Sequence, residues 1–305
     1  MSFTSDVKNE VSKLNHERIE MIAELSVILK NNANIGESIK ITTENPSVAR
    51  YVYSAIKQLY GISSKINVRN GYNYTKNYIY IIEVSKKLRD IIKDLSLDTN
   101  IPRSYIIDDE LSKRAYLRGL FIACGSINDP KKSRYHLEFF VDDSEYAEFI
   151  KGLLNEYDLN SKVLKRENKY MIYIKEAEKI GDFLRTMNAI NSLFYFEDIR
   201  IYRDHKNMTN RLNNCEQANV DKIIATASNQ VNDIKVIEEE GGLDLLNEKE
   251  QIAAIYRKKY PEASLVELSE IISVETDTKI TKSGLYHRFN KIKDLAQKIR
   301  EKSKE

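Results

Sequence analysis

The sequence predicts an α+β N-terminal region, built from two pseudo-symmetric αββ repeats, followed by an all-α C-terminal domain. Three observations support this fold class: a weak internal duplication, a lapse of the hydrophobic pattern around residues 204–214, and a basic C-terminal segment with helical periodicity. At 305 residues the chain exceeds what one small core usually needs, so we expect two or three folding units.

The first helix of each predicted repeat shows the duplication most directly. The segment LSVILKNNANI (25–35) aligns with LRGLFIACGSI (117–127), 92 residues later. Both end in small or polar residues just before a predicted strand, at Ser38–Thr43 in the first copy and at His136–Val141 in the second. Two units that pack through these first helices are expected to form a pseudo-symmetric saddle. We expect Gly119 and Ser26 to let the two helix backbones approach closely.

The second half of each repeat follows the same pattern. Segment 47–66 resembles 144–163, each with a polar helix start, an apolar stripe of helical spacing, and Ser-Lys leading into a strand. Segment 78–92 resembles 170–184, each with alternating apolar residues and then an amphipathic helix. Each copy therefore predicts a helix, a strand, a helix, two strands and a helix.

Beyond residue 204 the hydrophobic pattern lapses, which predicts a linker between folded regions. An amphipathic helix is expected after it, ending at Gly241-Gly242, and a further helix over 247–260 that stops at Pro261. The predicted boundaries are 1–108 for the first lobe, 109–205 for the second, 206–217 for the linker and 218–305 for the helical domain.

The helical domain ends in a pattern typical of a helix-turn-helix, predicted at 264–295. Ser264-Leu265-Val266-Glu267 has capping-box form and predicts a short helix to about Ile272. A turn around Thr276–Thr278 separates it from Thr281, the predicted N-cap of a basic helix. A short helix, a tight connection and a basic second helix together indicate double-stranded DNA as the partner.

The second helix can be divided into an apolar and a polar face. With Leu285, Phe289, Ile292 and Ala296 inward, the 100° helical step places polar side chains outward. We expect these to meet base edges and phosphates, although a solvated polar face is the alternative interpretation. The predicted contact residues are Lys282, Ser283, Tyr286, His287, Arg288, Asn290, Lys291 and Lys293.

Charge distribution supports the same interpretation. The net charge is only +2, but nine basic residues lie between Lys279 and Lys304 against two acidic ones. Such a local positive field attracts phosphates, whereas a solvated basic tail is the simpler alternative.

Composition excludes several other classes of protein. We expect neither a membrane span nor a secretory signal, and the only two cysteines, Cys124 and Cys215, lack metal-site spacing. The four histidines are scattered, so no metal or cofactor is expected, and the predicted location is the cytoplasm, on the nucleoid.

The segment LRGLFIACGSI resembles the LAGLIDADG motif of homing endonucleases, and LSVILKNNANI resembles an eroded copy of it. In active members of that superfamily, the acidic residue before the final glycine of the motif binds the catalytic divalent metal. The corresponding positions here are Asn32 and Cys124. Neither is an anionic oxygen ligand suited to Mg²⁺, so the resemblance implies the fold without the catalysis.

Four ordered stretches resemble the WhiA family of Gram-positive sporulation and cell-division regulators. This resemblance implies a degenerate LAGLIDADG region, a C-terminal helix-turn-helix and action at promoters. Tyr286 and Phe289 depart from the Asn and Leu usual in the family pattern. The four stretches are SFTSDVKNEVSKL (2–14), AYLRGLFIACGSINDPKKSRYHLEF (115–139), NRLNNCEQAN (210–219) and ITKSGLYHRFNKI (280–292).

The function predicted from these observations is a sequence-specific DNA-binding transcriptional regulator without enzymatic activity. A second transcription factor or RNA polymerase is a further partner to consider. One alternative is a nucleoid-associated division factor that acts through protein partners. The other is an active metal-dependent endonuclease, which requires substitute acids such as Asp129 or Glu37 near the degenerate positions.

Overall fold

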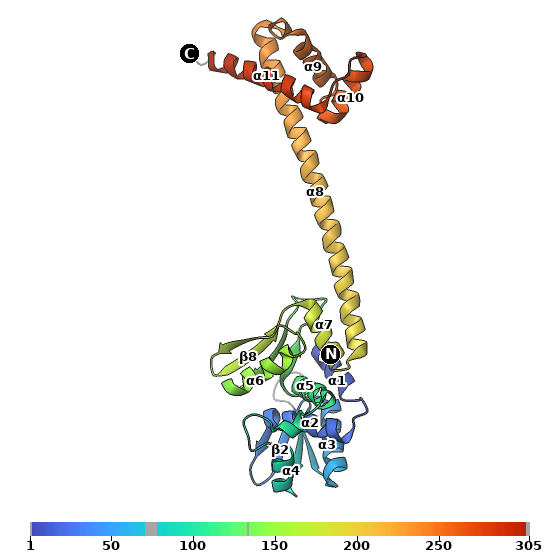
Figure 1. Cartoon of the computed structure of the whole chain (residues 1–305), viewed down its shortest axis with the longest axis vertical. Helices are drawn as coiled ribbons and strands as arrows, with labels where there is room; N and C mark the ends of the chain where they lie inside the picture. The colour runs from blue at the N-terminus through green and yellow to red at the C-terminus, as the bar shows by residue number, and fades with distance from the viewer. Residues whose placement is uncertain (1, 71–77, 133, 303–305) are drawn as a thin grey trace. The chain divides into compact units, whose positions relative to one another are not determined.

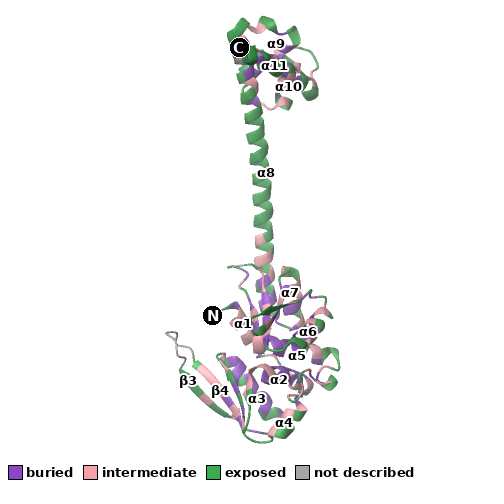
Figure 2. Ribbon diagram, turned by 90° about the vertical axis from the view of Figure 1, so that its left-hand side faces the viewer, coloured by how far each residue is buried: buried purple, intermediate pink, exposed green. Residues whose placement is uncertain are grey.

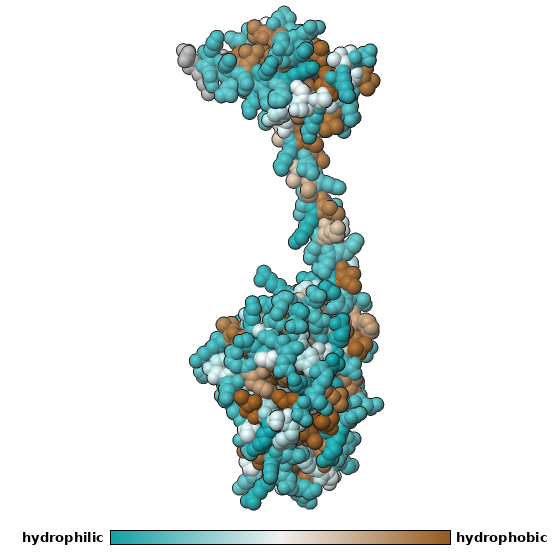
Figure 3. Space-filling view, in the orientation of Figure 1, coloured by the Kyte–Doolittle hydropathy of each residue, from teal (hydrophilic) through white to brown (hydrophobic). Residues whose placement is uncertain are grey.

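The computed structural model describes residues 2–70, 78–132 and 134–302 (Figure 1). It divides into two compact units, Met1–Asp204 and His205–Glu305. Lys304, one of the basic residues counted above, lies outside the described residues. No helix in the described part of the chain is long and apolar enough to cross a bilayer. Hydrophilic side chains cover most of the face of each unit that Figure 3 shows.

The first unit begins with a short helix and then contains two repeats of the same element order. The opening helix is α1 (Phe3–Val11). The first repeat comprises α2 (Arg18–Asn32), β1 (Ala33–Ile35), β2 (Ile39–Thr43), α3 (Pro46–Tyr60), β3 (Lys65–Asn70), β4 (Tyr78–Val84) and α4 (Leu88–Asp94). After a 3₁₀ turn (Ser104–Ile106), the second comprises α5 (Glu110–Cys124), β5 (Gly125–Ile127), β6 (Leu137–Val141), α6 (Ser144–Asn155), β7 (Lys162–Arg166), β8 (Lys169–Ile174) and α7 (Ala177–Thr186).

Each repeat builds one antiparallel sheet of four strands, in the orders β1-β2-β4-β3 and β5-β6-β8-β7. The matching orders confirm the predicted duplication. Ile41 pairs with Ile82, and the equivalent Phe139 pairs with Ile172. Ile82 of β4 therefore corresponds to Ile172 of β8, at an offset of 90 residues instead of the predicted 92. A shift of two residues keeps every side chain on its face of the sheet, so the predicted alternation still holds.

The prediction of three strands in each repeat was one strand short. The additional strands, β1 and β5, follow directly after the first helix of each repeat and are three residues long. A segment of that length is too short to show a two-residue alternation of apolar side chains, so its sequence gives no periodic signal.

The first helices of the two repeats, α2 and α5, pack against each other at the centre of the unit (Figure 1). A Cβ atom on Gly119 of α5 would lie 2.7 Å from the Cα atom of Glu24 and 2.6 Å from Cγ1 of Val27, both on α2. The predicted role of Gly119 is therefore confirmed. For Ser26 the structure shows a hydroxyl that donates a hydrogen bond of 2.7 Å to the carbonyl of Leu95, just after α4.

Helix α8 (Ile190–Gly241) starts in the first unit and ends in the second. The predicted linker at 206–217 is therefore helical. Residues 204–226 are all exposed, as the green stretch of α8 in Figure 2 shows. The chain has neither glycine nor proline between Gly181 and Gly241 to end a helix. The hydrophobic pattern lapses here because these residues make no core contacts. The backbone of this stretch is nevertheless helical.

The second unit packs three further helices against the end of α8. They are α9 (Glu248–Lys259), α10 (Leu265–Glu275) and α11 (Lys282–Lys302). Both predicted helix starts have a capping box, formed by Asn247 with Glu250 and by Ser264 with Glu267. Helix α10 ends three residues later than predicted, at Glu275, and its core partners are the apolar residues of α11 together with Ile234 and Ile237 of α8.

Candidate nucleic-acid interface

The start of α11 is fixed by a cap and by a buried apolar face. The hydroxyl of Thr281 accepts a hydrogen bond of 3.1 Å from the backbone N–H of Gly284, as expected for an N-cap. Leu285, Phe289, Ile292 and Ala296 are all buried. These contacts set the rotation of the helix about its axis, and they leave the opposite face exposed.

Ser273 fixes the connection between α10 and α11. Its hydroxyl accepts a hydrogen bond of 2.9 Å from the N–H of Ile280 and donates one of 2.6 Å to the carbonyl of Ser269. Asp277, in the same connection, has a φ of +49°. The sequence analysis did not single out Ser273, since a serine inside a helix gives no signal of a contact seven residues away.

Six of the eight predicted contact residues are exposed. Tyr286 has 52% of its surface exposed, and its ring centre lies 6.1 Å from that of His287. Asn290 and Arg288 are half-buried. The remaining exposed residues are Lys282, Ser283, Lys291 and Lys293.

Two of the predicted cations contact the N-terminal end of α9. Arg288 donates a hydrogen bond of 3.3 Å to the carbonyl of Lys249, and the Lys291 ammonium lies 3.6 Å from a carboxylate oxygen of Glu250. The Lys291 side chain remains 68% exposed, so this ion pair contributes little to stability. Lys291 can therefore leave this ion pair at low cost.

The centre of the first unit holds the two positions where the resemblance places catalytic acids. The side-chain amide of Asn32 donates a hydrogen bond of 3.1 Å to the carbonyl of Ala123 in the other repeat. Burial raises the pKa of the Cys124 thiol to about 12. An amide and a protonated thiol supply no negative charge, so these two positions lack the ligands that Mg²⁺ prefers.

Two buried acids also lie on α2, and both contact the same arginine. Glu24 is fully buried on α2 and accepts hydrogen bonds from Arg118 of α5 and from Tyr51 of α3. Arg118 also donates a hydrogen bond of 2.6 Å to Glu20. Burial, and then the Glu24 carboxylate, raises the pKa of Tyr51 well above its ordinary value. This cluster connects the two repeats, because the glutamates lie on α2 and the arginine lies on α5. Removal of either partner would leave a buried charge without its counter-ion.

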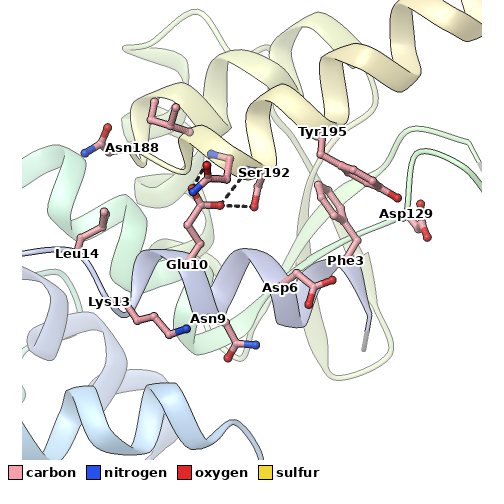
Figure 4. Close-up of a pocket in the computed structure, with 12 residues that line it drawn as sticks. Phe3, Asp6, Asn9, Glu10, Lys13, Leu14, Asp129, Asn188, Ser192 and Tyr195 are labelled. Carbon is pink, nitrogen blue, oxygen red and sulfur yellow. Dashed lines mark hydrogen bonds between the residues drawn. The ribbon is translucent and has the colours of Figure 1, made fainter.

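The substitute acids considered above lie elsewhere. Asp129 accepts a hydrogen bond of 2.9 Å from the backbone N–H of Lys131 and lines a cavity of about 840 Å³ with Phe3, Glu10 and Tyr195 (Figure 4). Glu37 is exposed between β1 and β2. In the described part of the chain, no group of three or more His, Cys, Asp and Glu residues could hold a metal ion.

Family models match three consecutive parts of the chain. One described as the WhiA N-terminal LAGLIDADG-like domain matches residues 18–98. One described as the WhiA LAGLIDADG-like domain matches residues 113–206. One described as the WhiA C-terminal HTH domain matches residues 209–296.

Whole-chain comparisons give the same result. The chain is 42% identical over 311 residues to the probable cell division protein WhiA of Bacillus cytotoxicus, covering 98% of both proteins. A full-length WhiA crystal structure from Thermatoga maritima aligns with a TM-score of 0.58 and 24% identity, over 98% of this chain and 99% of that one. The solved N-terminal LAGLIDADG domain of a WhiA aligns with a TM-score of 0.50 and 22% identity, over 61% and 92%.

Proposed function

The chain belongs to the WhiA family, and from this premise we propose that it is a DNA-binding transcriptional regulator that does not cut DNA. Its targets are promoters of cell-division or sporulation genes. The curated relative, which matches almost the full chain, is named a probable cell division protein. That name supports the cell-division part of the proposal.

The exposed N-terminal face of α11 carries this proposal. In a helix-turn-helix the second helix enters the major groove, and its first residues meet the base edges. Ser283, Tyr286, His287 and Asn290 supply donors and acceptors for that role. The cations on the same helix, Lys282, Arg288, Lys291 and Lys293, serve the phosphates and contribute binding to any sequence.

The proposal that the protein does not cut DNA is argued from two residues at the centre of the first unit. Asn32 and Cys124 stand where the metal ligands of a nuclease are required, and Asn32 uses its amide for a contact between the repeats. Purified protein incubated with supercoiled plasmid and Mg²⁺ or Mn²⁺ should leave the plasmid intact. Nicking that disappears in an Asp129→Asn variant would contradict the proposal.

Titrations of duplex DNA at several salt concentrations test the role of α11. Replacement of His287 or Asn290 by alanine should cost about 1–3 kcal/mol for the specific duplex and little for a scrambled one. Replacement of Lys293 or Lys298 by alanine should weaken binding to both duplexes and lower the salt dependence.

The specific duplex for these titrations comes from chromatin immunoprecipitation, which should give discrete promoter sites. Diffuse coverage of the chromosome would favour the alternative of a nucleoid-associated division factor. The assignment of α11 as the reading helix fails if the His287 and Asn290 variants keep full discrimination while substitutions in the first unit abolish it.

A further inference from the structure

The second unit contains a pocket of about 320 Å³ that shares only Lys282 with the predicted contact residues. Its walls come from α8, from the connection between α9 and α10, and from the first residues of α10 and α11. Three cations line it, one from each of three helices: Lys222 of α8, Arg257 of α9 and Lys282 of α11. No acidic residue is among the lining residues.

Arg257 is the unusual member of this group, because only 1% of its surface is exposed. One terminal nitrogen of its guanidinium donates hydrogen bonds to the carbonyls of Tyr260 (3.3 Å) and Ala263 (2.5 Å). The group also lies over the ring of Phe289, 5.4 Å from its centre. Its Nε–H has no hydrogen-bond partner in the structure. Two carbonyl dipoles and an aromatic face, but no carboxylate in the pocket lining, therefore balance this buried charge, which favours an anion in the adjoining pocket.

The first turn of α10 lines the same pocket and offers backbone N–H groups to it. The hydroxyl of Ser264 accepts from the N–H of Glu267, and the Glu267 carboxylate accepts from the N–H of Ser264. The Glu267 carboxylate stays ionised in this cap, because hydrogen bonds from Ser264 lower its pKa. The N–H groups of Leu265 and Val266 belong to the first turn of α10, where no intrahelical acceptor is available. An 11-residue helix presents a partial positive charge there.

Apart from Thr226, the remaining lining is apolar. Ile223 of α8 is 37% exposed and Val266 of α10 is 45% exposed. A cationic pocket beside exposed aliphatic groups matches one phosphate together with its sugar. The C–H groups of a deoxyribose can lie against these two side chains. The first helix of a helix-turn-helix also crosses the DNA backbone, which brings phosphates to this end of α10.

We propose that Lys222, Arg257 and Lys282 form a binding site for one DNA backbone phosphate, with the adjoining sugar against Ile223 and Val266. The inference rests on the proposed function of α11 and extends it, because it makes α8 a second DNA-contacting element. Lys222 then acts as a positioning contact that carries no sequence information.

The salt dependence of DNA binding by the full chain tests this site. Each phosphate contact contributes about 0.9 to the slope of log K against log salt concentration. A Lys222→Gln variant should lower the slope by about that amount for specific and scrambled duplexes alike. The control is Lys235→Gln, an exposed lysine of the same helix that does not line the pocket; it should leave the slope unchanged. Melting temperatures of both variants should match that of the wild type.

A double variant sharpens the test. If Lys222 and Lys282 share one phosphate, replacing both by glutamine should lower the slope by about 0.9 in total, since only one contact is lost. A decrease in the slope of about 1.8 would show that the two lysines contact two separate phosphates, and it would overturn the shared site. An unchanged slope in Lys222→Gln would overturn the site altogether.

Unfolding experiments with inorganic phosphate distinguish a site for the DNA backbone from a site for a free anion. If phosphate stabilises the wild type against unfolding but not Lys222→Gln, while both have the same slope for DNA, the pocket takes a free anion and the proposal is wrong. Failure of the wild type to bind any duplex would instead refute the proposed function itself. Binding whose slope does not depend on Lys222 would refute only this further inference.

Discussion

The close packing of α2 and α5 gives a sharp prediction for the substitution Gly119→Ala. In an ordinary helix, alanine is favoured over glycine by about 1 kcal/mol. At Gly119 the added Cβ atom would lie 2.7 Å from Glu24 Cα and 2.8 Å from its carbonyl oxygen. Both of these atoms belong to the backbone of α2, so no side-chain rotation can relieve the contact.

The structure sets the size of the effect. Ordinary van der Waals contact begins at 3.4 Å, so the two helices would have to separate by roughly 0.7 Å at this point. Overpacking of a well-packed core typically costs about 1–3 kcal/mol. Separation of α2 from α5 would also stretch the buried contacts of Glu24 with Arg118. After subtraction of the gain of about 1 kcal/mol in helix propensity, overpacking leaves a loss of up to about 2 kcal/mol, to which the stretched contacts of Glu24 add, so we expect a net loss of stability.

Gly152 of α6 provides a matched control in the same repeat. It is exposed, and a Cβ atom there would meet nothing within 4 Å. Gly152→Ala should therefore stabilise the first unit by about 0.5–1 kcal/mol. Urea unfolding with hydrogen exchange of α2 and α5 peptides as the readout assigns each change to this unit. Opposite signs are expected, and stabilisation by both substitutions would refute the close-packing argument.

Three further predictions concern other parts of the chain. Glu10→Ala should destabilise the first unit by about 0.5–2 kcal/mol in thermal unfolding, because its carboxylate accepts from the N–H and hydroxyl of Ser192 at the start of α8; an unchanged melting temperature would contradict this. Since burial raises the pKa of Cys124 to about 12, its contribution to stability should be complete below about pH 8.5 and decline as the pH rises towards 12. A Cys124→Ala variant should lack that part of the decline, whereas Cys215→Ala, which removes an exposed thiol, should keep it. Limited proteolysis should cut near 205–218, where α8 has no core contacts, and give fragments on the order of 23 and 10 kDa; cleavage first at other places would count against two separately folded regions.

Local sequence patterns predicted much of the fold. Alternation along β2 and β4 and the stripe of α3 depend on neighbouring residues, so the order and faces of these elements could be predicted. The linker at 206–217 shows the limit of such patterns. Apolar periodicity reports burial, and a helix without core contacts loses the pattern while it keeps its backbone hydrogen bonds.

In the candidate sites, too, local patterns predicted some features, whereas features that depend on tertiary packing could not be predicted. The outward face of α11 follows from four apolar residues in one helix, and it could be predicted. The contacts of Arg288 and Lys291 with the start of α9 could not, because they depend on how two helices pack. Glu24 and Arg118 are 94 residues apart, so nothing local indicates that they meet. Lys222 and Arg257 likewise come together only in the folded domain.

The hydrogen bond of Asn32 has a consequence for any attempt to build a metal site between the two repeats. An acid at this position would remove the donor and place a carboxylate about 3.1 Å from the carbonyl oxygen of Ala123, where two acceptors repel each other. The first step towards metal binding would therefore weaken the contact between the repeats, before a second acid at position 124 could supply any benefit.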